Sequence, residues 1–166
     1  MARQLWLLRH AEAEPHGTRL DADRRLTERG ERQARAAGLA LARLGASFDA
    51  VLFSPKARAR QTAELAAAEW GPERRDRLRV HPPLAGGFDA HEALARAASL
   101  AADGRLLLVG HEPDLSGIVV ALTGARADLK KGGLAVVRLE GVDGELAALL
   151  RPRELALIAG IPADGN

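Results

Sequence analysis

The sequence predicts an α/β fold: a three-layer sandwich in which a mostly parallel central sheet carries helices on both faces. Short apolar runs alternate with longer segments of helical spacing, which is typical of strand–helix units. Two further strands flank a glycine turn near the C-terminus. The 166 residues, 47% hydrophobic and 28% charged, fit one domain over 1–166.

Four short apolar runs are predicted to be parallel strands, and they lie at residues 4–8, 49–53, 78–80 and 105–109. The last reads Arg-Leu-Leu-Leu-Val and has the composition of a strand buried on both faces. Residues 134–140 and 145–150 flank the turn Gly141-Val142-Asp143-Gly144, which predicts an antiparallel hairpin.

Helices are predicted between and after these strands, at residues 27–44, 54–70, 89–102, 113–122 and 152–159. Thr27 is the expected N-cap of the first helix, which Gly45 closes. Ser54 is the expected N-cap of the second, with Pro55 at its first helical position. The charged, irregular residues 12–25 predict a loop.

The composition excludes several classes of function. Without cysteine there is no disulfide scaffold, thiol catalysis or Cys-based metal site. The 24 basic and 22 acidic residues are interspersed, which favours a solvated surface over a nucleic-acid patch. The N-terminal apolar run is too short for a signal peptide, and no run is long enough to span a membrane. We therefore expect a soluble, cytoplasmic protein with no nucleic-acid or membrane partner.

Polar side chains follow three of the predicted parallel strands. Arg9 and His10 follow the first, Arg58 comes soon after the second, and His111 follows the strand at 105–109. Because ligands in such sheets bind beyond the carboxyl ends of the strands, we expect these side chains to converge. Guanidinium groups match phosphate oxygens, and a neutral imidazole can attack phosphorus. The sequence therefore predicts a phosphoryl-transfer site without a metal or another cofactor.

Four stretches match motifs of a known family in the family's order. Leu8-Arg9-His10-Ala11 resembles the Arg-His-Gly signature of the histidine phosphatase superfamily, also called phosphoglycerate mutase-like. Residues 54–63 resemble its Ser-Pro-x-x-Arg-Ala-x-Gln-Thr-Ala motif, and residues 109–113 its third motif. Residues 26–34 resemble the Leu-Thr-x-x-Gly-x-x-Gln-Ala stretch of its first helix. The short chain and its Arg-His-Ala-Glu-Ala start look like the SixA branch, the phosphohistidine phosphatases.

The resemblance implies a role for each of four residues. His10 would be the phosphorylated nucleophile, Arg9 and Arg58 would bind the phosphoryl group, and His111 would complete the pocket. The implied substrate is a phosphorylated protein, such as a histidine phosphotransfer domain of a signalling relay, and phosphate or another oxyanion would bind in the pocket. The alternatives are a small-molecule phosphomonoesterase of the same superfamily and a phosphate- or phosphoprotein-binding module without turnover.

Two positions depart from the family pattern. Ala11 stands where the superfamily usually has glycine, which requires that the backbone there does not need a positive φ. Larger members carry an acidic general acid after the third strand, whereas residues 82–88 contain no carboxylate. Glu12 is a candidate substitute acid, and the alternative is that it is a solvated loop residue. A missing acid favours a phosphoramidate such as phosphohistidine, whose nitrogen can be protonated before the P–N bond breaks.

One more stretch bears on anionic ligands. Lys130-Lys131-Gly132-Gly133 precedes a predicted strand and is interpreted first as a solvated loop. The alternative is that it lines the mouth of the pocket and attracts anionic substrates.

Overall fold

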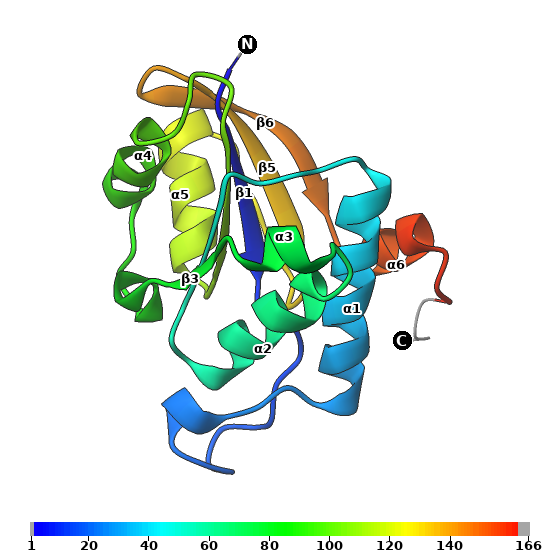
Figure 1. The fold of residues 1–166 in the computed structure, drawn as a ribbon. Coiled ribbons are helices and arrows are strands. Elements are labelled where there is room, and N and C mark those ends of the chain that lie inside the picture. The colour runs from blue at the N-terminus through cyan, green and yellow to red at the C-terminus, as the bar shows by residue number, and fades with distance from the viewer. Residues whose placement is uncertain (1, 163–166) are drawn as a thin grey trace.

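The computed structural model describes residues 2–162 and confirms the α/β fold (Figure 1). Within these residues, one sheet holds β1 (Gln4–Arg9), β2 (Ala50–Phe53), β3 (Leu78–Val80), β4 (Arg105–Gly110), β5 (Leu134–Glu140) and β6 (Asp143–Leu150). Its strand order is β3-β2-β4-β1-β5-β6. Four neighbouring strands, from β3 to β1, are parallel, whereas β5 runs antiparallel to both β1 and β6.

Helices cover both faces of the sheet, as Figure 1 shows. On one face lie α1 (Glu28–Arg43), α2 (Ala57–Ala67) and α6 (Pro152–Ala159), and on the other α4 (Ala90–Ala98) and α5 (Asp114–Thr123). The alternation of side chains along a strand explains how one apolar run serves two cores. In β1, Trp6 and Leu8 pack toward α1, whereas Leu5 and Leu7 pack toward α5.

Helices α1 and α2 approach each other to backbone distance at Gly38. A Cβ atom at this position would lie 2.2 Å from the carbonyl oxygen of Ala66 on α2. The indole nitrogen of Trp70 also donates to the carbonyl oxygen of Gly38, at 2.9 Å. A side chain at position 38 would therefore push the two helices apart, and with them the start of α2 that carries Arg58.

The predicted start of the second helix is wrong by two residues. Lys56, not Ser54, is the N-cap, and α2 begins at Ala57. The Ser54 hydroxyl accepts a hydrogen bond from the Lys56 backbone N–H at 3.2 Å and also contacts His111, so residues 54–56 form a separate turn. Pro55 lies in this turn and not in the helix.

Other boundaries differ from the sequence-based expectation by short segments. The loop at 12–25 contains a 3₁₀ turn, η1 (Asp21–Asp23), and a second one, η2 (Pro82–Ala85), follows β3. Helix α2 ends at Ala67, and a four-residue helix, α3 (Pro72–Arg75), lies beyond it. Helix α4 ends at Ala98, with Ser99 as its C-cap, which is four positions before the predicted end.

The C-terminal hairpin turns more tightly than predicted. Glu140 pairs with Asp143, so the turn consists of Gly141 and Val142 alone. Gly141 has a φ of +64°, a conformation that glycine adopts without a steric penalty. Over residues 2–162, none of the helices has the length and apolar composition needed to cross a membrane.

Candidate active site

The ends of three neighbouring strands bring the four predicted residues together. Arg9 ends β1 and His10 follows it, while His111 follows β4, which pairs with both β1 and β2. Arg58 lies in the first turn of α2, just beyond β2. The rings of His10 and His111 have centroids 5.2 Å apart at an interplanar angle of 53°. Both histidines and Arg58 are buried, and Arg9 is partly exposed.

His10 is held as a neutral imidazole with its Nε2 lone pair free. Its Nδ1 lies 2.8 Å from the carbonyl oxygen of Ala11. Because a carbonyl can only accept, we assign the proton to Nδ1, and Nε2 remains unprotonated. Burial lowers the pKa of His10 to about 3, against the effect of this hydrogen bond and helped by the positive charges of its neighbours. At neutral pH the ring is therefore a potential nucleophile.

His111 is hydrogen-bonded to the protein through Nε2, whereas His10 is bonded through Nδ1. Its Nε2 lies 2.7 Å from the hydroxyl of Ser54, whose oxygen already accepts from the Lys56 N–H. The hydroxyl has one proton and a second lone pair, so it can donate to Nε2 or accept from it. We assign it as the donor, which puts the ring proton of His111 on Nδ1. Burial, followed by the charges of Arg58 and Lys56, lowers the pKa of His111 to about 4. The sequence predicts only a capping role for Ser54, and no local pattern indicates this contact.

Three buried N–H donors of this site have no hydrogen-bond partner within residues 2–162: Arg9 Nε, Arg58 Nε and His111 Nδ1. Leaving a buried donor unpaired costs roughly 1–3 kcal/mol, so such groups are rare without a functional reason. The guanidinium groups are otherwise held in place. Arg9 donates to the Leu129 carbonyl at 2.9 Å, and Arg58 to the Asp21 carbonyl at 2.7 Å. The arrangement suits an anion with several oxygens.

Asp21, on η1, is a neighbour of the site that the sequence did not reveal. Its carboxylate lies 2.9 Å from Arg24, 3.0 Å from Lys56 and 3.3 Å from Arg58. Hydrogen bonds from Lys56 and Arg24 hold the pKa of this carboxyl well below its usual range. Asp21 is therefore an anion at neutral pH that positions Arg58, and it is not a proton donor.

Glu12 and Ala11 occupy places that bear on the two departures from the family pattern. The Glu12 carboxylate accepts from the Thr27 hydroxyl at 3.1 Å, at the start of α1. Ala11 is fully buried, and its N–H donates to Thr62 Oγ1 at 3.1 Å. Every residue with positive φ in the described part of the chain is a glycine, so the methyl group of Ala11 causes no backbone strain.

The loop before β5 fixes the backbone of the site. Gly132 N donates to the His10 carbonyl at 2.9 Å, and Arg9 N donates to the Gly133 carbonyl at 3.0 Å. The side chains of Lys130 and Lys131 are exposed and line a cavity beside Arg9. As to metals, the described residues contain no cluster of three or more His, Asp or Glu placed to hold an ion.

Comparisons with known proteins bear on the family and the fold of this chain. The model of the histidine phosphatase superfamily (branch 1) matches residues 5–82. A protein of Picosynechococcus sp. is 39% identical over 148 residues, which cover 81% of this chain and 87% of that protein. Among solved structures, the protein histidine phosphatase SixA complexed with tungstate superposes with a TM-score of 0.80 at 24% identity, covering 92% of this chain and 99% of SixA.

Two further solved structures bear on the choice of substrate. One from Nakamurella multipartitia, assigned provisionally as a phosphohistidine phosphatase SixA, has a TM-score of 0.76 at 30% identity, covering 92% of this chain and 97% of its own. The α-ribazole phosphatase of Shigella flexneri has a TM-score of 0.65 at 20% identity, covering 98% of this chain and all of its own. The fold is therefore shared by phosphatases with different substrates.

Proposed function

Because this chain belongs to the histidine phosphatase superfamily, we propose that it hydrolyses phosphohistidine on a protein through a phosphorylated intermediate on His10. The observation that carries the proposal is the set of three buried, unpartnered donors around a neutral imidazole. Arg9, Arg58 and His111 supply the donors, and each can bind an oxygen of the phosphoryl group.

The reaction takes two displacements at phosphorus. In the first, His10 Nε2 attacks in line, the bond from phosphorus to the substrate nitrogen breaks, and the substrate imidazole leaves with a proton already taken from solvent. In the second, water attacks the phosphorylated His10, the P–Nε2 bond breaks, and inorganic phosphate leaves with the protons of the water. Arg9 and Arg58 offset the negative charge of the phosphoryl oxygens during both steps, and His111 donates a hydrogen bond to them from Nδ1. None of these steps requires a metal ion.

The carboxylates near the pocket favour a leaving group that needs little help from the enzyme. Asp21 is held as an anion by three cations, and Asp89, the first acidic residue after β3, caps α4. Glu12 remains the candidate acid, although its carboxylate contacts Thr27 at the start of α1. An imidazole that leaves from phosphohistidine is a much better leaving group than an alkoxide, so this setting supports a phosphoramidate substrate.

A small phosphate ester is the second candidate substrate, because α-ribazole phosphatases share the fold. A non-catalytic phosphate-binding module is the third candidate function. Turnover measurements distinguish all three.

The test is phosphate release from a phosphohistidine peptide, an aryl phosphate and an alkyl phosphate, with a chelator present. Wild type is compared with His10→Ala and with His16→Ala, a matched control because His16 is exposed. We expect chelator-resistant release, fastest from the phosphohistidine peptide, in wild type and the control. The His10 variant should lose at least about a thousandfold in kcat, the scale on which loss of a nucleophile acts.

The other outcomes separate the candidates. Faster release from the alkyl phosphate would favour the small-ester reading, and loss of activity with chelator would overturn the metal-free mechanism. Activity in the His10 variant equal to wild type would show that another group is the nucleophile. Binding of phosphate without hydrolysis of any of the three substrates would favour the non-catalytic binding module. Glu12→Gln tests the candidate acid, whose loss should slow the alkyl phosphate more than the phosphohistidine peptide.

A further inference from the structure

A cavity of about 600 Å³ lies beside the phosphoryl pocket, and Arg9 lines it. Its walls come from the N-terminal turns of α1 and α6 and from the loop before β5. The two histidines and Arg58 are not among its lining residues. The cavity is therefore a separate space that adjoins the catalytic pocket at one side chain.

The lining of this cavity is strongly cationic. Seven of its side chains are Arg or Lys, whereas Glu12 is the one carboxylate among the described residues that line it. Arg9 contributes from the end of β1, Lys131 from the loop before β5, and Arg153 from α6. Exposed ion pairs join Lys130 to Asp128 and Arg151 to Glu154, while Arg9, Lys131 and Arg153 add three further positive charges to the lining.

The rest of the lining is apolar, including Ala36 of α1 and Ala156 of α6, both buried, and Ile161. The volume is that of sites for small ligands, which are concave and combine an apolar wall with a few polar anchors. Guanidinium forks bind phosphate oxygens in pairs, and several in one cavity match several phosphate groups.

We propose that this cavity binds a small polyphosphorylated molecule, one with at least two phosphate groups on a compact body. Such a ligand can be inorganic, or it can carry an organic group that rests on the apolar wall. The site does not depend on the proposed phosphohistidine phosphatase activity, because binding needs neither His10 nor turnover.

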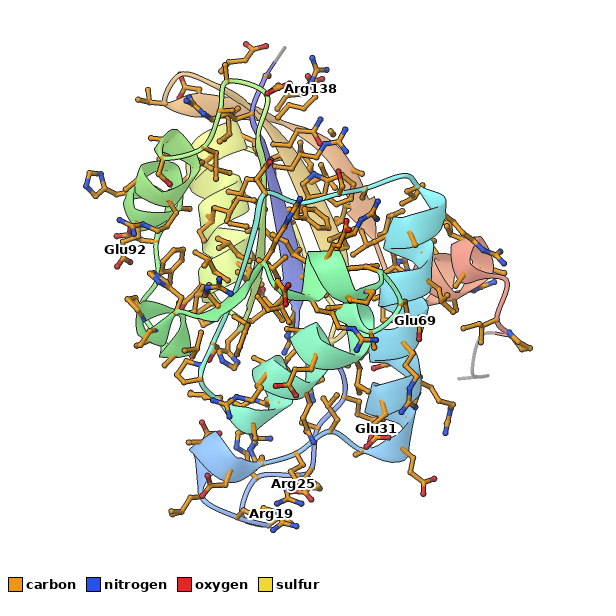
Figure 2. The ribbon with its side chains drawn as sticks, in the orientation of Figure 1. Arg19, Arg25, Glu31, Glu69, Glu92 and Arg138 are labelled. Carbon is orange, nitrogen blue, oxygen red and sulfur yellow. The ribbon has the colours of Figure 1, made fainter. Side chains whose placement is uncertain are left out.

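The experiment is calorimetric titration of the full chain at about 0.15 M salt, an ionic strength that screens diffuse surface charge. The probes are inorganic tripolyphosphate, ADP and orthophosphate. The cavity variant is Lys131→Ser with Arg153→Ser. The matched control is Arg96→Ser with Arg138→Ser, which removes the same charge from exposed positions outside the cavity. Figure 2 shows Arg138 at the end of the molecule opposite Arg19 and Arg25.

We expect tripolyphosphate to bind the wild type and the control equally, and to bind the cavity variant at least about tenfold more weakly, as expected for the loss of two charge-assisted contacts. Arg58→Ala, which alters only the phosphoryl pocket, should retain the binding. ADP binding more tightly than tripolyphosphate would identify an organic polyphosphate, and the reverse order an inorganic one. Thermal unfolding of each variant verifies that it folds.

Three results would overturn the proposal. Equal weakening in the cavity variant and the control would mean that the probe responds to net charge alone. A loss of binding confined to Arg58→Ala would place tripolyphosphate in the phosphoryl pocket. Absence of binding by both tripolyphosphate and ADP to the wild type would show that the cavity is not a polyphosphate site. None of these results depends on catalytic activity, so a failure here is distinct from a failure of the proposed function.

Discussion

On acidification from pH 7.5 to pH 5.0 the folded chain should lose stability. Replacing both His10 and His111 by glutamine should abolish most of that loss. The two folded-state pKa values, about 3 and about 4, lie below the value of roughly 6.5 in an unfolded chain. The unfolded chain therefore binds protons more tightly, and acidification favours unfolding. This stabilisation is complete above pH 6.5 and is lost as the pH falls toward the folded pKa values.

The magnitude follows from the proton linkage. At pH 5.0 an unfolded-state imidazole is mostly protonated while both buried rings are still neutral, so each histidine costs about 2 kcal/mol, or about 4 kcal/mol together. The value at this pH is nearly the same for any folded pKa below about 4.5. Burial also lowers the pKa of His81, which adds a smaller loss of the same sign to every variant.

Urea unfolding at the two pH values measures this loss within each variant, so a change in baseline stability cancels. Between the two pH values, wild type and the control His16→Gln should each lose about 4 kcal/mol or more of their free energy of unfolding. The variants with only His10 or only His111 replaced should each lose about 2 kcal/mol less than the wild type. The reasoning is refuted if the wild type loses under about 1 kcal/mol, or if the double variant loses as much as the wild type.

Three further substitutions test contacts around the site. Ser54→Ala removes the hydroxyl that lies 2.7 Å from His111 Nε2. The kcat for an aryl phosphate should fall about tenfold while the melting temperature stays nearly unchanged. An unchanged kcat would contradict the assigned tautomer of His111. Asp21→Asn removes a negative charge beside the phosphoryl pocket, so orthophosphate should bind about threefold more tightly by calorimetry, whereas weaker binding would show that positioning outweighs charge. Gly38→Ala should lower the free energy of urea unfolding by about 1–3 kcal/mol, because its methyl group would meet the carbonyl oxygen of Ala66. The control Gly117→Ala, whose methyl group would enter open space, should not lower it. Equal effects of the two substitutions would contradict the close contact between the helices.

The sheet and the convergence of the four site residues could be predicted because both follow from local patterns. Each buried run is short and apolar, and each is followed by a polar residue at the edge where parallel strands end together. Strand polarity puts His10 and His111 at the same edge of the sheet, and the pairing of β1 with β4 then makes them neighbours, with 5.2 Å between their ring centroids. The position of Arg58 is harder to predict than those of the other three residues, because it depends on the path of the chain from β2 into α2.

The parts that could not be predicted depend on contacts between segments distant in the chain. Ser54 followed by Pro55 is a strong local signal for a helix start, but the bond to His111, 57 positions away, draws the serine into the site. Asp21 lies in a stretch without periodicity, so no spacing indicates that it meets Lys56 and Arg58. Tertiary contacts override local propensity at such places, and a single sequence carries no signal for them.

The strand order also has a consequence during synthesis. β1 is made first, yet it lies between β4 and β5 in the finished sheet. Gln4 pairs with Arg105 and Arg138, so the apolar strand must wait for about 100 residues of further translation before it gains a partner. At the usual rate of roughly 5–20 residues per second, this wait lasts about 5–20 s. During that time the nascent chain exposes an unpaired Leu-Trp-Leu-Leu segment, and slower translation lengthens its exposure to chaperones and to aggregation.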